Sequence, residues 1–294
     1  MKAYYQVEKR DGYFRIGSAE SVFSYLIVGK ERAALIDTGY GLGDLKAAVE
    51  EVTRLPLMIL NTHGHCDHMG GNAQFDAPCY IHPKDMELAR RHAAPTMRRS
   101  NAQRLSHSVN FETGESFNAL PEDFDAARYE AMGPGRLVEA REGMTFDLGG
   151  ATLELIETPG HTAGGVSVYY REKQLLFVGD AANPFVWLFL QESTGKESYL
   201  AMLDRIDAMS VKGYLAGHMP RPMNHRDLAR FRRAALEADY EKGEPFEPFL
   251  DADRKARICA LAGADMFSPD FAAVVIAKDW QAKEKKDYET DQME

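Results

Sequence analysis

Apolar and polar positions alternate over the first 60 residues in a way that predicts both strands and a helix. Residues 22–29 and 33–37 are short apolar runs joined by a charged turn, as in two neighbouring strands. Residues 44–53 carry apolar side chains three or four positions apart, which predicts a helix with one buried face. Residues 57–60 are wholly apolar and predict a buried strand. The alternation indicates a mixed α/β fold.

Similar patterns recur in the second half of the chain. We expect helices at 83–94, 197–209 and 226–240, the last capped by Asn224. We expect a hairpin of 144–148 and 151–157, a strand pair at 165–170 and 174–178, and a short strand at 214–216. Residues 254–278 fit two strands or pieces of helix, and the last dozen residues indicate a frayed tail.

Residues 95–142 are the least regular part of the chain. They contain Pro95, Pro121 and Pro134 and several glycines, and we interpret them as an insertion rather than a core element. Such a long segment is expected to contain some helix, and to cover the functional site or mediate oligomerisation. Its arginines Arg98, Arg99 and Arg104 could meet an anionic substrate, but a solvated face is the favoured interpretation.

Composition narrows the function. The chain has 294 residues, 45% of them hydrophobic, and a formal net charge of −10, which disfavours nucleic acid as a substrate. Three cysteines provide no disulfide framework, which favours a reducing compartment. No apolar run is as long as a membrane-spanning helix, and the first residues do not resemble a secretion signal. We therefore expect a cytoplasmic protein with no membrane partner.

Histidines and aspartates follow several of the predicted strands. A polar loop beginning at Asn61 follows the strand at 57–60, and further polar residues follow the strands at 151–157, 174–178 and 214–216. If these strand ends are aligned, seven side chains of metal-ligand type converge at one edge. Neutral imidazole and carboxylate are the ligands that zinc takes in catalytic sites. The seven residues are His63, His65, Asp67, His68, His161, Asp180 and His218.

The same residues carry a resemblance to a known family. The run His63-x-His65-x-Asp67-His68, His161 in Pro-Gly-His-Thr, Asp180 in Val-Gly-Asp, and Gly217-His218 resemble the motifs of the metallo-β-lactamase superfamily, in the family's order. Asp37 in Ile-Asp-Thr-Gly matches its first motif. The resemblance spans roughly residues 20 to 220. It implies a four-layer αββα sandwich in residues 1–224, with 225–294 as a mostly helical or mixed extension.

The resemblance also implies roles for individual residues. His63, His65 and His161 would hold one metal, and Asp67, His68 and His218 would hold a second. Asp180 would bridge the two metals, and Asp37 would orient a ligand histidine. The implied cofactors are two zinc ions, with iron or manganese as alternatives. A hydroxide shared by the two ions would be the nucleophile, and Asp67 would be catalytic by steering a proton to the leaving group.

Several functions fit this ligand set. The favoured one is hydrolysis of a small ester, thioester or lactone, because the set resembles those of glyoxalase-II-like thioesterases and acyl-homoserine-lactone lactonases. A sulfur dioxygenase with one iron is the main alternative. A nuclease is disfavoured by the acidic composition, and a non-catalytic scaffold by the complete ligand set. The partner would be a small molecule, and a homodimer is left open.

Other residues near the motifs have two interpretations. Phe185, Trp187 and Phe189 directly follow Asp180, so they either pack in the core or form an apolar wall of the substrate pocket. Cys66 lies inside the first motif and is interpreted as a bystander. The remaining histidines are expected to be solvated or locally bonded; they are His82, His92, His107 and His225.

Overall fold

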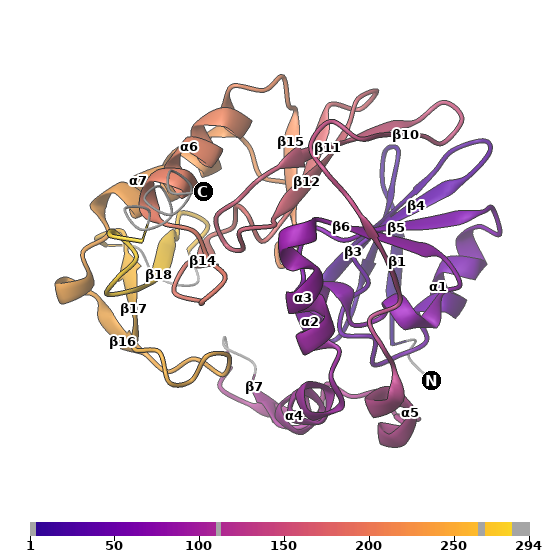
Figure 1. Ribbon diagram of the computed structural model, residues 1–294, viewed down its shortest axis with the longest axis horizontal. Helices are drawn as coiled ribbons and strands as arrows, with labels where there is room; N and C mark the ends of the chain where they lie inside the picture. The colour runs from indigo at the N-terminus through magenta and orange to yellow at the C-terminus, as the bar shows by residue number, and fades with distance from the viewer. Residues whose placement is uncertain (1–3, 110–112, 264–267, 284–294) are drawn as a thin grey trace, which may run out of the picture.

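Two facing β-sheets form the centre of the protein (Figure 1). The computed structural model describes residues 4–109, 113–263 and 268–283. The first sheet has seven strands in the order β1-β2-β3-β4-β5-β6-β9, and β4, β5, β6 and β9 are parallel. These strands are β1 (Gln6–Lys9), β2 (Phe14–Gly17), β3 (Phe23–Val28), β4 (Ala33–Ile36), β5 (Leu57–Leu60), β6 (Pro78–Ile81) and β9 (Arg136–Glu139).

The second sheet has five strands in the order β10-β11-β12-β13-β15. Its first four strands form an antiparallel meander, and β15 adds in parallel to β13. The predicted hairpin and strand pair are therefore confirmed. The strands are β10 (Thr145–Asp147), β11 (Thr152–Glu157), β12 (Val166–Tyr170), β13 (Leu175–Gly179) and β15 (Gly213–Ala216).

Alternation along the strands divides their side chains between an inner and an outer layer. In β4, Ala34 and Ile36 pack against the second sheet, whereas Ala33 and Leu35 pack on the opposite face. In β13, Phe177 lies in the layer between the sheets, together with Tyr25 of β3. Because both faces of β4 and β13 are buried, neither strand carries a polar side chain.

Helices cover the outer faces of both sheets, which completes the four-layer αββα sandwich (Figure 1). Leu45 and Val49 of α1 pack on the first sheet, and α6 and α7 pack on the second. Asp44 caps α1, and Asn224 caps α7 as predicted. The helices are α1 (Leu45–Val52), α2 (Cys66–Met69), α3 (Pro83–His92), α4 (Pro95–Leu105), α5 (Ala126–Ala131), α6 (Lys196–Asp207) and α7 (His225–Glu237).

The C-terminal part of the chain forms a further sheet with a strand from the middle of the chain. Its order is β14-β18-β17-β16, where β14 is Phe185–Trp187, β16 is Glu244–Phe246, β17 is Ala256–Ala260 and β18 is Ala273–Ala277. The ambiguous segment 254–278 thus contains two strands. Beyond them, Lys283 donates to the carbonyls of Leu190, Gln191 and Ser193, which ties the end of the described chain to the loop that follows β14.

Residues 95–142 differ from the expected insertion in one important respect. The segment contains the expected helices, α4 and α5, and a two-stranded β7–β8 sheet of Ser108–Val109 and Ser116–Phe117. Its strand β9, however, is the edge of the central sheet, so the prediction that no part is a core element is wrong. β9 has only four residues and is half-buried, which left little periodic signal in the sequence.

The prediction that Arg98 lies on a solvated face is wrong. It is buried and donates to backbone carbonyls of Gly70, Ala93, Met132 and Gly133, so it anchors α4 to the rest of the fold. Within the described ranges, no helix combines the length and apolar character needed to cross a membrane.

Candidate metal centre

Loops that follow five strand ends carry the histidines and aspartates. β4 and β5 are parallel, so Asp37 and the loop from Asn61 leave the first sheet at one edge. β13 and β15 are parallel, so Asp180 and His218 leave the second sheet together. The loop after β11 brings His161 to the same region. The structure thus brings together all seven residues expected from the sequence.

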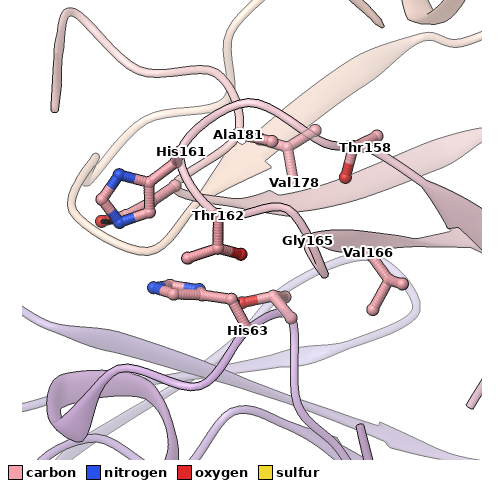
Figure 2. A pocket seen from close by; sticks show the side chains of 10 residues that line it. His63, Thr158, His161, Thr162, Gly165, Val166, Val178 and Ala181 are labelled. Atoms are coloured by element: carbon pink, nitrogen blue, oxygen red, sulfur yellow. Dashed lines mark hydrogen bonds and ion pairs between the residues drawn. The ribbon is translucent and has the colours of Figure 1, made fainter. Parts of the chain in front are cut away.

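His63, His65 and His161 form the first group of potential ligands. Each offers one ring nitrogen, and these atoms lie within 4.8 Å of one another. Nε2 of His161 lies 2.9 Å from Nδ1 of His65. Figure 2 shows the rings of His63 and His161 approaching one another from loops of different sheets.

Asp67, His68, Asp180 and His218 form the second group, with the same upper limit of 4.8 Å between ligand atoms. Nε2 of His218 lies 3.3 Å from carboxylate oxygens of both Asp67 and Asp180. Asp180 also approaches the first group, because its Oδ2 is 3.9 Å from Nε2 of His161. One carboxylate therefore borders both groups.

The ring nitrogens that point away from the groups are held by other parts of the chain. Nε2 of His65 is 2.7 Å from Glu192, and Nδ1 of His161 is 2.7 Å from the carbonyl oxygen of Trp187. Nδ1 of His63 is 3.1 Å from the hydroxyl of Thr62. Such contacts fix the orientation of an imidazole and the nitrogen that it presents to a metal.

Asp37 supports the second group. Its carboxylate accepts hydrogen bonds from the Thr62 backbone N–H and hydroxyl and lies 2.8 Å from Nδ1 of His68. Asp37 has a φ of 57°, a left-handed conformation that is uncommon outside glycine. The strained backbone aims the carboxylate at the loop after β5.

Asp85 of α3 connects the loops that carry the first group. Its buried carboxylate accepts hydrogen bonds from the backbone N–H groups of Gly64 and Gly164 and from the hydroxyl of Thr162. One side chain thus fixes the loop between His63 and His65 to the loop after His161.

Glycine is required beside the second group at position 217. A Cβ atom on Gly217 would lie 2.4 Å from Cε1 of His68, closer than any real contact. The glycine therefore lets the β15 end approach the imidazole and places His218 beside it.

Burial and neighbouring charge shift the pKa values of the histidines in opposite directions. Burial lowers the pKa of His63 well below its usual value and that of His161 to about 4. Burial opposes charge on His68 and His218, but the carboxylates of Asp180 and Asp67 outweigh it. They raise the pKa of His68 well above its usual range and that of His218 to about 10.

The carboxylates show the opposite shift. Burial favours their neutral form, yet the facing histidines lower the pKa of both Asp67 and Asp180. Glu192 behaves alike, because its contact with His65 outweighs burial and lowers its pKa to about 2, while the pKa of His65 is raised. The site therefore holds ionised carboxylates opposite histidines.

Two buried atoms indicate that the groups suit metal ions. Among the described residues, Nε2 of His63 and Oδ1 of Asp180 have no hydrogen-bond partner, although both are buried. Buried polar atoms without a partner are costly, and a cation would satisfy both. Imidazole nitrogens and carboxylate oxygens with oriented outer nitrogens are the donor set of a catalytic zinc or iron site.

The three aromatic residues after Asp180 differ in their exposure. Phe189 is fully buried in a cluster with Val275 and Phe246, so it packs in the core and does not form a pocket wall. Phe185 and Trp187 are half-buried at the edge of that cluster. The cavity at the first group is small, with an empty volume of about 180 Å³, and is lined by Thr62, His63, Thr158, His161, Thr162, Gly165, Val166, Val178, Asp180 and Ala181 (Figure 2).

Sequence reasoning missed Glu192, Asp85 and His92. His92 was expected to be solvated or locally bonded, but it is buried, stacks on His65 and accepts the N–H of Cys66. Its pKa is lowered to about 3, mainly by burial. Asp85 stands two positions after Pro83 at a helix start, where a capping role looks sufficient, and Glu192 lies in no motif.

Comparison with known proteins agrees with this geometry. A family model described as the metallo-beta-lactamase superfamily matches residues 17–237. Human acyl-coenzyme A thioesterase MBLAC2 is 23% identical over 244 residues, which cover 77% of this chain and 81% of the human protein.

Solved structures share the fold. The di-iron-bound form of TTHA1623 is 25% identical with a TM-score of 0.51, covering 71% of this chain and 92% of that one. The sec-alkylsulfatase Pisa1 from Pseudomonas sp. has a TM-score of 0.59 at 15% identity, covering 78% of this chain and 41% of its own. The chain belongs to the metallo-beta-lactamase superfamily and is a metal-dependent hydrolase.

Proposed function

We propose that the protein is a binuclear zinc hydrolase that cleaves small thioesters, with esters and lactones as related substrates. The observation that carries the proposal is the position of Asp180. Its Oδ2 lies 3.3 Å from Nε2 of His218 and 3.9 Å from Nε2 of His161, so one carboxylate borders both ligand groups. A bridging carboxylate suits a two-metal hydrolase.

The ligand roles follow from the two groups. His63, His65 and His161 would hold one ion, and Asp67, His68 and His218 would hold the other, with Asp180 shared. When bound, two divalent ions would supply Lewis acidity that polarises a carbonyl group and lowers the pKa of water. Zinc is proposed because a set of five imidazoles and two carboxylates suits it, although a neighbour of similar fold was solved in a di-iron form.

Asp67 is the proposed proton carrier. Its facing histidines outweigh burial and hold its pKa low, so the carboxylate is ionised at neutral pH. An ionised carboxylate at the site can accept a proton from the attacking water and deliver it to the leaving thiolate or alkoxide, which departs as the thiol or alcohol.

The thioester substrate class is supported by the human relative, which is an acyl-coenzyme A thioesterase. Trp187 and Phe185 are proposed to contact the acyl chain. Trp187 is half-buried, and its carbonyl oxygen accepts from His161, which places its residue next to the first ligand group.

Hydrolysis by purified, zinc-reconstituted protein tests the proposal. Thiol release from acetyl thioesters is compared for the wild type, His65→Ala and Asp180→Ala, with His107→Ala as a matched control because His107 is exposed. We expect the wild type and His107→Ala to be equally active, and the two site variants to lose at least about 100-fold in kcat/KM together with bound zinc.

Different outcomes would contradict different parts. Full activity of His65→Ala would remove His65 from the centre. Absence of hydrolysis of every ester, thioester and lactone, with oxygen consumption on a persulfide substrate and one iron per chain, would assign the sulfur dioxygenase alternative instead.

A further inference from the structure

Three arginines of α4 differ in how their charges are satisfied. Arg98 is buried against backbone carbonyls, and Arg99 forms a close ion pair with Glu130. Arg104 is half-buried, and within the described part of the chain it forms no ion pair with a carboxylate. Arg104 is therefore a half-buried cation that an anionic ligand could neutralise.

Two neutral groups hold the Arg104 side chain in place. Its Nη2 donates to the hydroxyl of Tyr40 over 2.8 Å, and its guanidinium lies 4.1 Å from the centre of the Phe249 ring. A phenol and an aromatic ring orient a guanidinium without neutralising it. The planar group thus keeps further N–H donors for a ligand.

Both contacts lead toward the candidate metal centre. Tyr40 packs in one apolar cluster with Cys66, which stands between His65 and Asp67. On the other side, the Phe249 ring centre is 5.1 Å from that of Trp187. The carbonyl of Trp187 accepts from His161, so each of the two residues that Arg104 contacts lies close to a residue next to a ligand group.

The two aromatic residues that contact Arg104 come from distant parts of the chain. Tyr40 follows β4 of the first sheet, whereas Phe249 follows β16 of the C-terminal sheet. In Figure 1 the segment after β16 runs toward α4 and β7. Arg104 therefore stands where the C-terminal part of the chain meets α4, outside the residues that would hold metal.

We propose that Arg104 binds an anionic group, a carboxylate or a phosphate, on the part of the substrate away from the bond that is cleaved. The proposal rests on the proposed thioesterase function and adds that the preferred substrate is anionic. A guanidinium binds either anion through two parallel N–H donors. Arg104 thereby acts on substrate binding and not on the chemical step.

Three acetyl thioesters separate the possibilities. Acetyl-coenzyme A carries phosphates, S-acetylglutathione carries carboxylates, and S-acetyl-N-acetylcysteamine is neutral with the same reacting group. The variants are Arg104→Met, which keeps an apolar stem against Phe249, and Arg104→Lys, which keeps the charge. Arg99→Met is the matched control, because Arg99 lies on the same helix, is solvent-exposed and already has an ion-pair partner in Glu130.

For the anionic substrate that Arg104 binds, we expect Arg104→Met to raise KM about 10- to 100-fold with kcat within about twofold. KM for the neutral thioester should not change, Arg104→Lys should recover part of the loss, and Arg99→Met should match the wild type. Whether the phosphate or the carboxylate substrate responds identifies the anion. An equal effect on the neutral thioester, or no effect on either anionic one, would overturn the proposal.

A binding measurement keeps the test independent of hydrolysis. Calorimetry with S-methyl-coenzyme A and S-methylglutathione, whose sulfur cannot act as a thiolate, measures anion binding to wild type and Arg104→Met. If no thioester is cleaved but one probe binds the wild type at least about 10-fold more tightly than Arg104→Met, the proposed function fails and the anion site stands. Equal binding of both probes to both proteins overturns the anion site.

Discussion

Oε1 of Glu192 lies 2.7 Å from Nε2 of His65, and this contact turns Nδ1 of His65 toward His161. The two residues come from opposite halves of the chain. Lys283 donates to carbonyls on both sides of Glu192, so the C-terminal segment helps to place the carboxylate. The imidazole of His65 is thus oriented by residues outside the recognised motifs.

Glu192→Gln should weaken metal binding by the first group. The amide can still contact His65, but it removes the negative charge that supports the imidazole as a ligand, so we expect about a 10- to 100-fold loss of affinity. Competition with a chromophoric chelator measures this, with exposed Glu197→Gln as the control. Equal affinities of both variants would show that Glu192 does not tune His65.

Asp85→Ala should destabilise the metal-free protein by at least about 2 kcal/mol, because three buried donors lose their acceptor. Urea denaturation in the presence of chelator measures the change without a contribution from bound metal. Asp76→Ala removes an exposed carboxylate and should change stability by less than about 0.5 kcal/mol. A loss of metal with unchanged stability would instead make Asp85 specific to the site.

Metal binding to the second group should release protons. In the metal-free protein the carboxylates hold the pKa of His218 at about 10 and that of His68 well above its usual range, so both are protonated at pH 7. An imidazole must lose its second ring proton before it can bind a metal ion, so binding expels about two protons, and affinity rises as pH increases toward 10. His63 and His161, whose pKa values are lowered, are already neutral at pH 7.

Calorimetric zinc titration in buffers of different ionisation enthalpy counts these protons. His218→Ala should remove about one proton from the total, whereas His63→Ala should remove none. A zinc titration with no dependence on the buffer would contradict the protonated state of the second group.

The three cysteines should resist thiol reagents in the native state. Burial raises the pKa of Cys66 to about 12 and that of Cys79 to about 11, and it also raises the pKa of Cys259. Because the reactive thiolate forms only as pH approaches these values, labelling at pH 8 should be at least about 100-fold slower than in urea. Rapid labelling of Cys66 in native protein would show that its loop opens.

The resemblance to the family implied the four layers of the fold, whereas the central strands and the seven clustered residues were predictable from the sequence for a physical reason. The apolar runs of β4, β5 and β13 are buried on both faces, so they stand out from the polar loops that follow them. The short edge strand β9 carries no such contrast and was interpreted as part of an insertion.

The supporting contacts of the site were not predictable. Glu192 acts through one long-range contact with His65, and Asp85 acts through three long-range hydrogen bonds, from Gly64, Thr162 and Gly164. Such contacts leave no periodic pattern in the sequence. The position of Phe189 was not predictable either, because an apolar side chain fits both a pocket wall and the core. Only its packing with Val275 distinguishes the two.

The number of metal ions per chain tests the central claim most directly. Elemental analysis of protein purified without chelator and reconstituted with zinc should give about two zinc ions for the wild type and about one for His218→Ala. His107→Ala should match the wild type. One ion or fewer in the reconstituted wild type, with no further loss in Asp180→Ala, would contradict a two-metal centre bridged by Asp180.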